Sequence, residues 1–144
     1  MIMKIRDFNV KDINEVVQIL KLNNQYSRLL EGPEAMKRVS ECEAAVYLVA
    51  EKESKVVGVI KGIYDGSRAL IHQISVHPEY QKQGIGRALV QEIARRFKER
   101  GAPSVAVTAS TQSKEFFEKL GFKELTYAVF MVADSIDEVI EKIK

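Results

Sequence analysis

The stretch that decides the fold reads Ile74-Ser75-Val76-His77-Pro78-Glu79-Tyr80-Gln81-Lys82-Gln83-Gly84-Ile85-Gly86. Strand formers lead into a loop with two glycines, and a helical pattern follows at once, with one apolar face made of Leu89, Val90, Ile93 and Phe97. The first N–H groups of a helix lack internal partners, and the helix dipole adds partial positive charge there. Since glycines let backbone amides approach phosphate oxygens, this stretch predicts an anion site.

The loop matches neither of the common nucleotide-binding motifs. The third glycine of a G-x-G-x-x-G motif would fall on Leu89, and the P-loop pattern G-x-x-x-x-G-K-[ST] is absent. Lys82 and Arg87 add positive charge that suits a polyanion. Two glycines before a helix also occur in ordinary helix entries, so a purely structural role is the alternative at this point.

The pattern of elements along the chain indicates a mixed α/β sheet. We expect a strand at 3–6, helices from Asn9 and Pro33, strands at 45–50, 56–60 and 69–76, a helix after Gly86, a buried strand at 104–109, a helix at 112–120, a strand at 122–132, and a last helix behind the capping box Ser135-x-x-Glu138. No repeat or linker interrupts this order, so one domain over residues 1–144 is expected.

Composition and charge exclude several classes of partner. The 144 residues are 46% hydrophobic and 29% charged, which is ordinary for a globular domain. The net charge of +2 comes from scattered side chains, so no nucleic-acid binding is expected. No apolar run approaches the roughly 20 residues that cross a bilayer, so no membrane partner is expected either. Cys42 is alone, which favours a reducing, cytoplasmic location.

Two motifs carry a resemblance to a known family. Gln81 to Gly86 matches the [RQ]-x-x-G-x-[GA] signature of the GNAT N-acetyltransferase superfamily. Phe116-Phe117-Glu118-Lys119-Leu120-Gly121-Phe122 resembles its F-Y-x-x-x-G-F stretch, at the usual separation. The element order also matches along nearly the whole chain. The resemblance implies a GNAT fold, in which helices flank a mostly antiparallel sheet with one splayed pair of parallel strands.

The resemblance implies acetyl-CoA as cosubstrate and no metal. The main chain of Ile74, Ser75 and Val76 would bind pantetheine at the gap beside the strand at 104–109. The pyrophosphate would bind Gln81, Lys82, Gln83, Gly84, Ile85, Gly86 and Arg87. The remaining residues assigned to the cofactor are Ser110, Ser113, Phe116 and Phe117, of which the two aromatic residues would close the other wall.

Acyl transfer from a thioester to an amine needs a proton acceptor, an oxyanion donor and protonation of the leaving thiolate. In the family the oxyanion donor is a backbone N–H of the central strand, here Val76. His72, which should alternate with Leu70, Ile74 and Val76 on one face, matches by position a histidine of arylalkylamine acetyltransferases and is the candidate base; a structural histidine is the alternative.

Two departures from the family pattern affect the catalytic assignment. The strand at 69–76 carries no glutamate, and the family's general-acid tyrosine falls on Phe117, which has no hydroxyl. Tyr127, early in the expected strand at 122–132, is therefore the candidate acid. Tyr64 and water are alternatives, and a packed aromatic residue is the structural interpretation of Tyr127.

The expected function is acetyl transfer to a primary amine of a small molecule, peptide or protein. The polar run Asn23-Asn24-Gln25-Tyr26-Ser27-Arg28, within residues 22–33, and the strand at 122–132 should choose the acceptor. A non-catalytic acyl-CoA-binding domain with a sensor or regulatory role is one alternative, and a pure interaction module is another. The apolar stretch from Tyr127 to Val132 suits either a homodimer interface or burial in the chain's own core.

Overall fold

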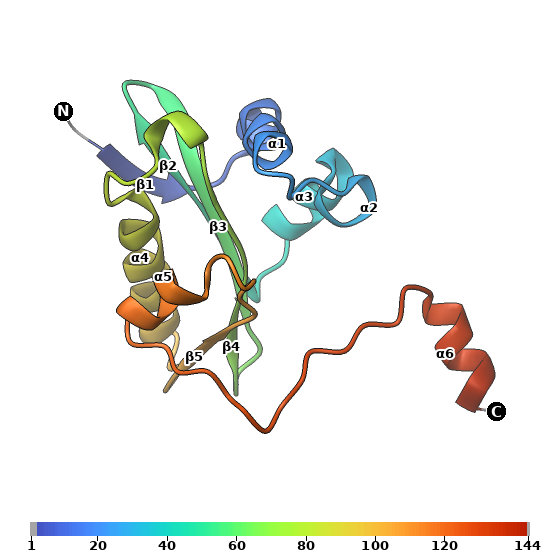
Figure 1. Cartoon of the computed structure of the whole chain (residues 1–144). Helices are drawn as coiled ribbons and strands as arrows, with labels where there is room; N and C mark the ends of the chain where they lie inside the picture. Colours follow the sequence, from blue (N-terminus) through green and yellow to red (C-terminus); the bar gives the residue numbers. More distant parts are fainter. Residues whose placement is uncertain (1–2, 144) are drawn as a thin grey trace. The chain divides into compact units, whose positions relative to one another are not determined.

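Five β-strands form one sheet whose spatial order, β1-β2-β3-β4-β5, follows their order in the chain (Figure 1). The structure is a computed structural model that describes residues 3–143. Its strands are β1 (Met3–Asp7), β2 (Ala45–Lys52), β3 (Lys55–Tyr64), β4 (Ala69–Val76) and β5 (Val105–Val107). The first four are antiparallel neighbours, whereas β4 and β5 run parallel. The predicted mixed, mostly antiparallel sheet is confirmed.

The β2–β3 hairpin forms the centre of the sheet. Its two turn residues, Glu53 and Ser54, have φ angles of 51° and 65°. Positive φ at both positions matches the twist of the flanking strands, which lets a two-residue turn join them. Residues 46–50 and 56–60 are buried, and apart from Gly58 and the hydroxyl of Tyr47 their side chains are apolar. Such continuous apolar runs are typical of strands that are covered on both faces.

Helices cover both faces of this sheet. Figure 1 shows α4 (Ile85–Glu99) on one side, and α1 (Ile13–Leu22), α2 (Arg28–Glu31) and α3 (Pro33–Ser40) on the other. Gly58 of β3 faces α4, because a Cβ there would lie 3.1 Å from Leu89 Cδ1. On the opposite face, Phe8 packs with side chains of α1, α3 and the sheet that include Val16, Ile19, Leu20, Met36, Tyr47, Val49 and Val59.

The first helical segment begins at the predicted N-cap, Asn9. The Asn9 side chain accepts a hydrogen bond from the Lys11 amide at 2.9 Å, and the Asp12 carboxylate accepts one from the Asn9 amide at 2.8 Å. Asp12 also pairs with Arg6 of β1 at 2.8 Å. These bonds hold a short 3-10 turn, η1 (Val10–Asp12), between β1 and α1. A second 3-10 turn, η2 (Pro78–Tyr80), follows β4.

The chain divides into two compact units, the first ending at Val107 and the second starting at Thr108. The second unit contains α5 (Lys114–Lys119) and α6 (Ile136–Ile143). Of the predicted capping box, the bond from the Glu138 amide to Ser135 Oγ is present, at 3.4 Å. The helix α5 starts two residues later than predicted, because residues 110–113 form a hydrogen-bonded turn in front of it.

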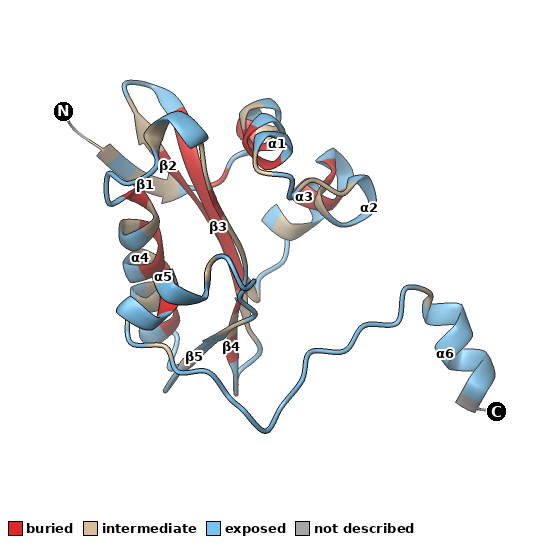
Figure 2. Ribbon diagram, viewed as in Figure 1, coloured by how far each residue is buried: buried red, intermediate tan, exposed pale blue. Residues whose placement is uncertain are grey.

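The predicted strand over residues 122–132 is wrong, because this stretch forms no strand in the described chain. Its apolar alternation predicts a strand, but a strand also needs a neighbour for its N–H and C=O groups. The segment before α6 is instead exposed (Figure 2), and Tyr127 is 85% exposed. β5 is also shorter than the predicted 104–109, and it is partly exposed rather than buried.

Candidate cofactor and acceptor site

The edge of β4 is open over its second half. β5 pairs with β4 at Ala69↔Val105, Leu70↔Ala106 and Ile71↔Val107 only, and β5 ends there. From residue 73 onward, β4 pairs with β3 alone in the described chain. The two parallel strands are therefore not laddered together along their length. The gap that the family resemblance implied beside residues 74–76 is present.

The peptide groups of Ile74 and Val76 point toward this open edge. His77 N donates to Val57 O at 2.8 Å, which identifies a hydrogen-bonded pair between β3 and the residue after β4. Antiparallel pairs alternate between bonded and non-bonded. The pairs Gly58↔Val76 and Ile60↔Ile74 are therefore the non-bonded type, and their N–H and C=O groups face away from β3.

Polar side chains already bind the carbonyl oxygens of this edge. Val76 O accepts hydrogen bonds from Gln81 Nε2 at 3.0 Å and from Asn23 Nδ2 at 2.8 Å, and Ile74 O accepts one from Gln25 Nε2 at 3.2 Å. Asn23 and Gln25 follow α1, so the loop that was predicted to choose the acceptor lies against β4. The sequence did not indicate these bonds, which join residues about fifty positions apart.

The glycine loop leads from the open edge to α4. Lys82 has a φ of 63° and Gly84 a φ of 85°, both in the left-handed region. A Cβ on Gly84 would meet nothing within 4 Å, so glycine is favoured there by its backbone conformation and not by lack of space. The side chains of Gln81, Lys82 and Gln83 are exposed. The loop therefore presents its backbone and its polar side chains to solvent.

The start of α4 has free backbone donors, and its role as an anion site remains a prediction. Gly84 is the N-cap residue of α4, and it has no side chain that could accept a hydrogen bond from the first amides. The first helical hydrogen bond runs from Ala88 N to Gly84 O at 3.0 Å. In the part of the chain that is described, the amides of Ile85, Gly86 and Arg87 have no acceptor. No acidic residue lies in the first turn. The helix end thus offers backbone donors and partial positive charge together.

A lysine that the sequence analysis missed also lies at this loop. Lys52 ends β2, and its Nζ donates to Gln83 Oε1 at 2.8 Å. The same ammonium lies 5.9 Å from the ring centroid of Tyr80. Lys52 therefore places a third positive charge at the loop that carries Lys82 and leads to Arg87. No local pattern marks it, because 31 residues separate it from Gln83.

His72 is the extra residue of a β-bulge in β4. The register shifts between Lys61 and Gly62, which pair with Gln73 and Ile71, so His72 has no partner of its own. The expectation that His72 shares one face with Ile74 and Val76 is therefore wrong. Val76 lies opposite Gly58 and faces α4, whereas His72 lies near the charges of Lys61 and Glu31 on the other face.

The surroundings of His72 lower the pKa of its imidazole. Its side chain is exposed at the surface, yet partial burial of the imidazole is the largest cause that lowers its pKa below 6.5. The Lys61 ammonium lowers the pKa further, and the Glu31 carboxylate opposes the shift. At neutral pH the imidazole is therefore uncharged and able to accept a proton.

The remaining predicted residues belong to the second unit. Phe117 is buried, and its ring centroid lies 5.0 Å from that of Phe116 and 5.3 Å from that of Phe122. The hydroxyl oxygens of Ser110 and Ser113 lie 3.0 Å apart. The roles of these side chains toward the cofactor remain predictions, as does the role of Tyr127.

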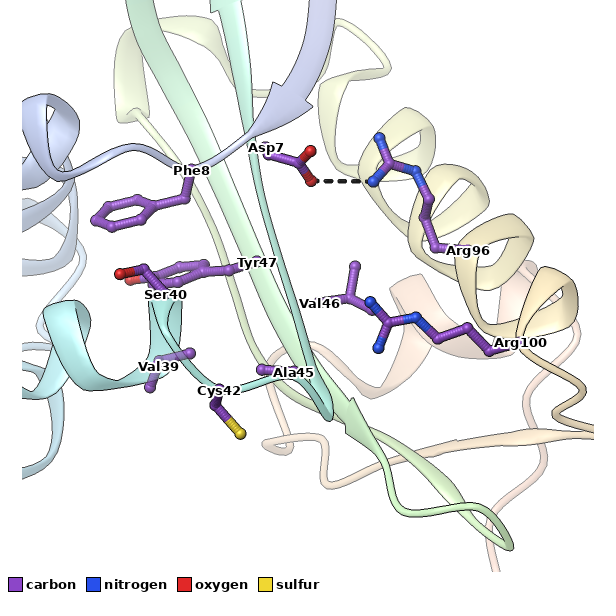
Figure 3. A pocket seen from close by; sticks show the side chains of 10 residues that line it. All are labelled: Asp7, Phe8, Val39, Ser40, Cys42, Ala45, Val46, Tyr47, Arg96 and Arg100. Carbon is purple, nitrogen blue, oxygen red and sulfur yellow. Dashed lines mark hydrogen bonds and ion pairs between the residues drawn. The ribbon is translucent and has the colours of Figure 1, made fainter.

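A separate small pocket lies at the other edge of the sheet, where β1 ends and leaves β2 uncovered (Figure 3). It measures about 120 Å³ and shares no residue with the predicted cofactor and catalytic set. Asp7 and Arg96 form an ion pair of 3.0 Å beside it, and Arg100 donates to Glu43 O at 3.0 Å. Because these charges already have partners, the pocket is not the candidate site.

Two further properties concern metals and membranes. Residues 3–143 contain no group of three or more histidine, cysteine, aspartate or glutamate side chains placed to hold a metal ion. None of the described helices combines the length and the apolar character needed to cross a bilayer.

Comparison with known proteins places this chain in a family. The model of the acetyltransferase (GNAT) family matches residues 15–122, and the chain belongs to that family. A transcriptional regulator from Bacillus halodurans C-125 is 26% identical with a TM-score of 0.78, over 92% of this chain and all of that chain. PaiA N-acetyltransferase from Thermoplasma acidophilum, solved with coenzyme A, is 20% identical with a TM-score of 0.78, over 85% and 91% of the two chains.

A predicted acetyltransferase from Clostridium acetobutylicum, solved with acetyl-CoA, has the same fold. It is 17% identical with a TM-score of 0.75, over 91% of this chain and 96% of that chain. The family match supports acetyl transfer as the general activity, and these neighbours show the same fold. The chemistry of the open β4 edge suits the amides of pantetheine. The start of α4, which no side chain caps, suits a pyrophosphate.

Proposed function

We propose that this chain transfers the acetyl group of acetyl-CoA directly to a primary amine of a small molecule or a peptide. The observation that carries the proposal is the open edge of β4, where the peptide groups of Ile74 and Val76 point outward. This edge leads into a loop and a helix end with unpaired amides. An extended chain with amides can bind such an edge as a strand does, and a diphosphate suits the helix end.

In this proposal, different residues of the chain take different roles in acyl transfer. Acetyl-CoA would supply the thioester whose carbonyl carbon the amine attacks. The Val76 N–H would donate to the developing oxyanion. The neutral imidazole of His72 would accept the proton that the amine loses. Tyr127 or water would protonate the leaving thiolate.

Part of the catalytic power would come from placement of the two reactants. Well-oriented neighbours can gain about 7–11 kcal/mol relative to reactants free in solution. Asn23 and Gln25 bind the same β4 carbonyls that face the gap, so the acceptor loop and the cofactor edge form one continuous surface. This arrangement supports direct transfer with both reactants bound.

A non-catalytic acyl-CoA sensor is the second candidate. Phe117 stands where the family motif has a tyrosine, and it cannot donate a proton. β4 carries no carboxylate that could hold a water molecule near the amine. Such a domain would bind acetyl-CoA at the same edge and would release no coenzyme A thiol.

Two measurements test the proposal. Titration with acetyl-CoA, followed by thermal unfolding, should stabilise the chain by about 2.7 kcal/mol at a ligand concentration one hundred times Kd. Release of coenzyme A thiol with a panel of amines should then separate the enzyme from the sensor. An unfolding temperature that does not change at high micromolar acetyl-CoA would refute both candidates.

A matched pair of variants locates the cofactor. Arg87→Gln removes an exposed charge from the first turn of α4 and should weaken acetyl-CoA binding severalfold. Lys98→Gln removes an exposed charge from the last turn of the same helix and should leave binding unchanged. Equal effects of the two substitutions would contradict the placement of the diphosphate.

A further inference from the structure

A row of polar side chains crosses the face of the sheet that α1 and α3 cover. Tyr47 of β2 pairs with Lys61 of β3, and Lys61 pairs with Gln73 of β4. Directly paired residues of adjacent strands lie on the same face, about 5 Å apart. The three side chains therefore form a continuous polar row, and Tyr47 also belongs to an apolar cluster with Phe8 and Val49.

The row contains a buried ion pair. Lys61 is only 7% exposed, and its Nζ binds Glu31 Oε2 of α2 at 2.6 Å. An ammonium has three N–H donors, and this is its one hydrogen bond within residues 3–143. Lys61 Nζ also lies 6.0 Å from the ring centroid of Tyr47, and N–H donors remain for another hydrogen-bond acceptor.

Two more polar atoms of the row are buried without a partner. Tyr47 is 6% exposed, and neither its hydroxyl nor Gln73 Oε1 makes a hydrogen bond in the described structure. Tyr47 stacks on Phe8, with ring centroids 4.2 Å apart, so its ring is fixed (Figure 3). Buried polar atoms without partners destabilise a fold and are rare, so the two atoms of this row are available to a water molecule or a polar ligand.

The groups of the row that can form further hydrogen bonds indicate the chemistry of a ligand that would bind there. The Lys61 ammonium and the Tyr47 hydroxyl are donors, and both suit a carboxylate. Gln73 Oε1 and the Glu31 carboxylate are acceptors, and both suit an amino group. A zwitterion inserted between Lys61 and Glu31 would replace one ion pair by two, whereas a polycation or a dicarboxylate would leave an unbalanced charge in a buried place.

The row also ends beside the reactive edge. Gln73 directly precedes Ile74, and His72, the candidate base, precedes Gln73. An amino group held at Gln73 would therefore lie one residue before Ile74, the first residue of the main chain that is proposed to hold pantetheine, and three residues before Val76.

We propose that the acceptor is an α-amino acid or a similar small amino-carboxylate, with its carboxylate bound by Lys61 and Tyr47 and its amino group by Gln73 and Glu31. This inference rests on the proposed acetyl transfer. It narrows the acceptor from primary amines in general to those that carry a carboxylate close to the nitrogen.

The first test compares matched acceptors. Each of a set of L-amino acids is assayed for coenzyme A thiol release beside its own amide and its own decarboxylated amine, with spermidine as a polycation. The inference expects kcat/KM for the best amino acid to exceed that of its amide and its amine at least tenfold. Equal rates, or a preference for spermidine, would overturn it.

The second test removes the proposed contacts. Tyr47→Phe deletes one buried oxygen that lacks a partner, so the variant should unfold at the same or a higher temperature. It should nevertheless raise KM for amino acids about tenfold and leave KM for the decarboxylated amines within about twofold. An unchanged KM for amino acids would overturn the role of Tyr47 and the inference with it.

A double variant tests the ion pair without leaving one charge buried alone. Lys61→Met combined with Glu31→Gln should abolish the preference for amino acids over their amides. Lys55→Met, at an exposed position of the same strand, is the control and should keep it. Retention of the preference in the double variant would overturn the inference.

Binding of acetyl-CoA separates this inference from the proposed function. If acetyl-CoA stabilises the chain but no amino acid is preferred, only the acceptor class is wrong. If acetyl-CoA gives no stabilisation, the proposed function fails and the acceptor inference fails with it.

Discussion

Asn23 should contribute more to stability than its position at the end of α1 suggests. Its Nδ2 donates to Ser75 Oγ at 2.7 Å and to Val76 O at 2.8 Å. Ser75 is buried, and Asn23 is the one partner of its hydroxyl in the described chain. Val76 O would keep its bond from Gln81. Asn23→Ala should therefore leave one buried hydroxyl unpaired, which costs about 1–3 kcal/mol.

A double-mutant cycle separates this cost from simple loss of contacts. Ser75→Ala removes the hydroxyl itself and leaves Asn23 bound to Val76 O, so it should cost only about 0.5–1.5 kcal/mol. With Ala at residue 75, Asn23→Ala no longer leaves a hydroxyl unpaired. The two substitutions should therefore be coupled by about 1 kcal/mol, above the error expected for independent sites.

Urea unfolding followed by far-ultraviolet circular dichroism measures these differences. Asn14→Ala is the control, because Asn14 is exposed on the same helix, α1. It should change stability by less than about 0.5 kcal/mol. Equal urea midpoints for Asn23→Ala and Asn14→Ala, or strict additivity in the cycle, would refute the reasoning. The same result would also remove the support for a continuous acceptor and cofactor surface.

Three further predictions concern other parts of the chain. Gly62→Ala should lower the free energy of unfolding by about 3 kcal/mol, because the new Cβ would lie 2.5 Å from Leu70 O. Gly66→Ala has nothing within 4 Å of its Cβ and should lower it by about 1 kcal/mol, from its φ of 99° alone. Similar losses for the two variants in chemical unfolding would contradict the clash at residue 62. The pH profile of kcat/KM should rise through a midpoint below 6.5, because burial and then the charge of Lys61 lower the pKa of His72, whose neutral imidazole is the proposed base. His72→Asn should remove this rise. A rise that persists in the variant would exclude His72 as the base. The exposed apolar stretch from Tyr127 to Val132 should associate with the same stretch of a second copy. Light scattering should then give the mass of a dimer for the full chain and of a monomer for Phe130→Asp. A monomeric full chain would contradict this prediction.

Local patterns predicted most of the first unit, because they depend on groups close together in sequence. The cap at Asn9, the helix opened by Pro33 and the strand at 69–76 all match the structure. The glycine loop belongs with them, since Gly84 is required by its own φ and the helix follows at the next residue. For the same reason, the conformation of the loop that is proposed to bind the cofactor could be predicted from the sequence.

Pairing between distant strands decided what local patterns could not. The bulge that separates His72 from the face of Ile74 and Val76 arises from the register between β3 and β4. The alternation of residues 122–132 satisfies the period of a strand, but a strand forms only where a neighbour receives its hydrogen bonds. The errors about the face of His72 and about the strand at 122–132 have the same cause. Each relied on a two-residue period in the sequence without knowledge of the neighbouring strand that would pair with it.

By itself, the sequence determined that a strand, a glycine loop and a helix follow one another, and it predicted that a diphosphate binds there. The tertiary structure alone decided what surrounds that loop. It brought Lys52 to Gln83, placed Asn23 on Val76, and buried Lys61 between Tyr47 and Gln73. The reason is that main-chain conformation depends on neighbouring residues, whereas a binding site is formed by side chains that come together only when the sheet pairs.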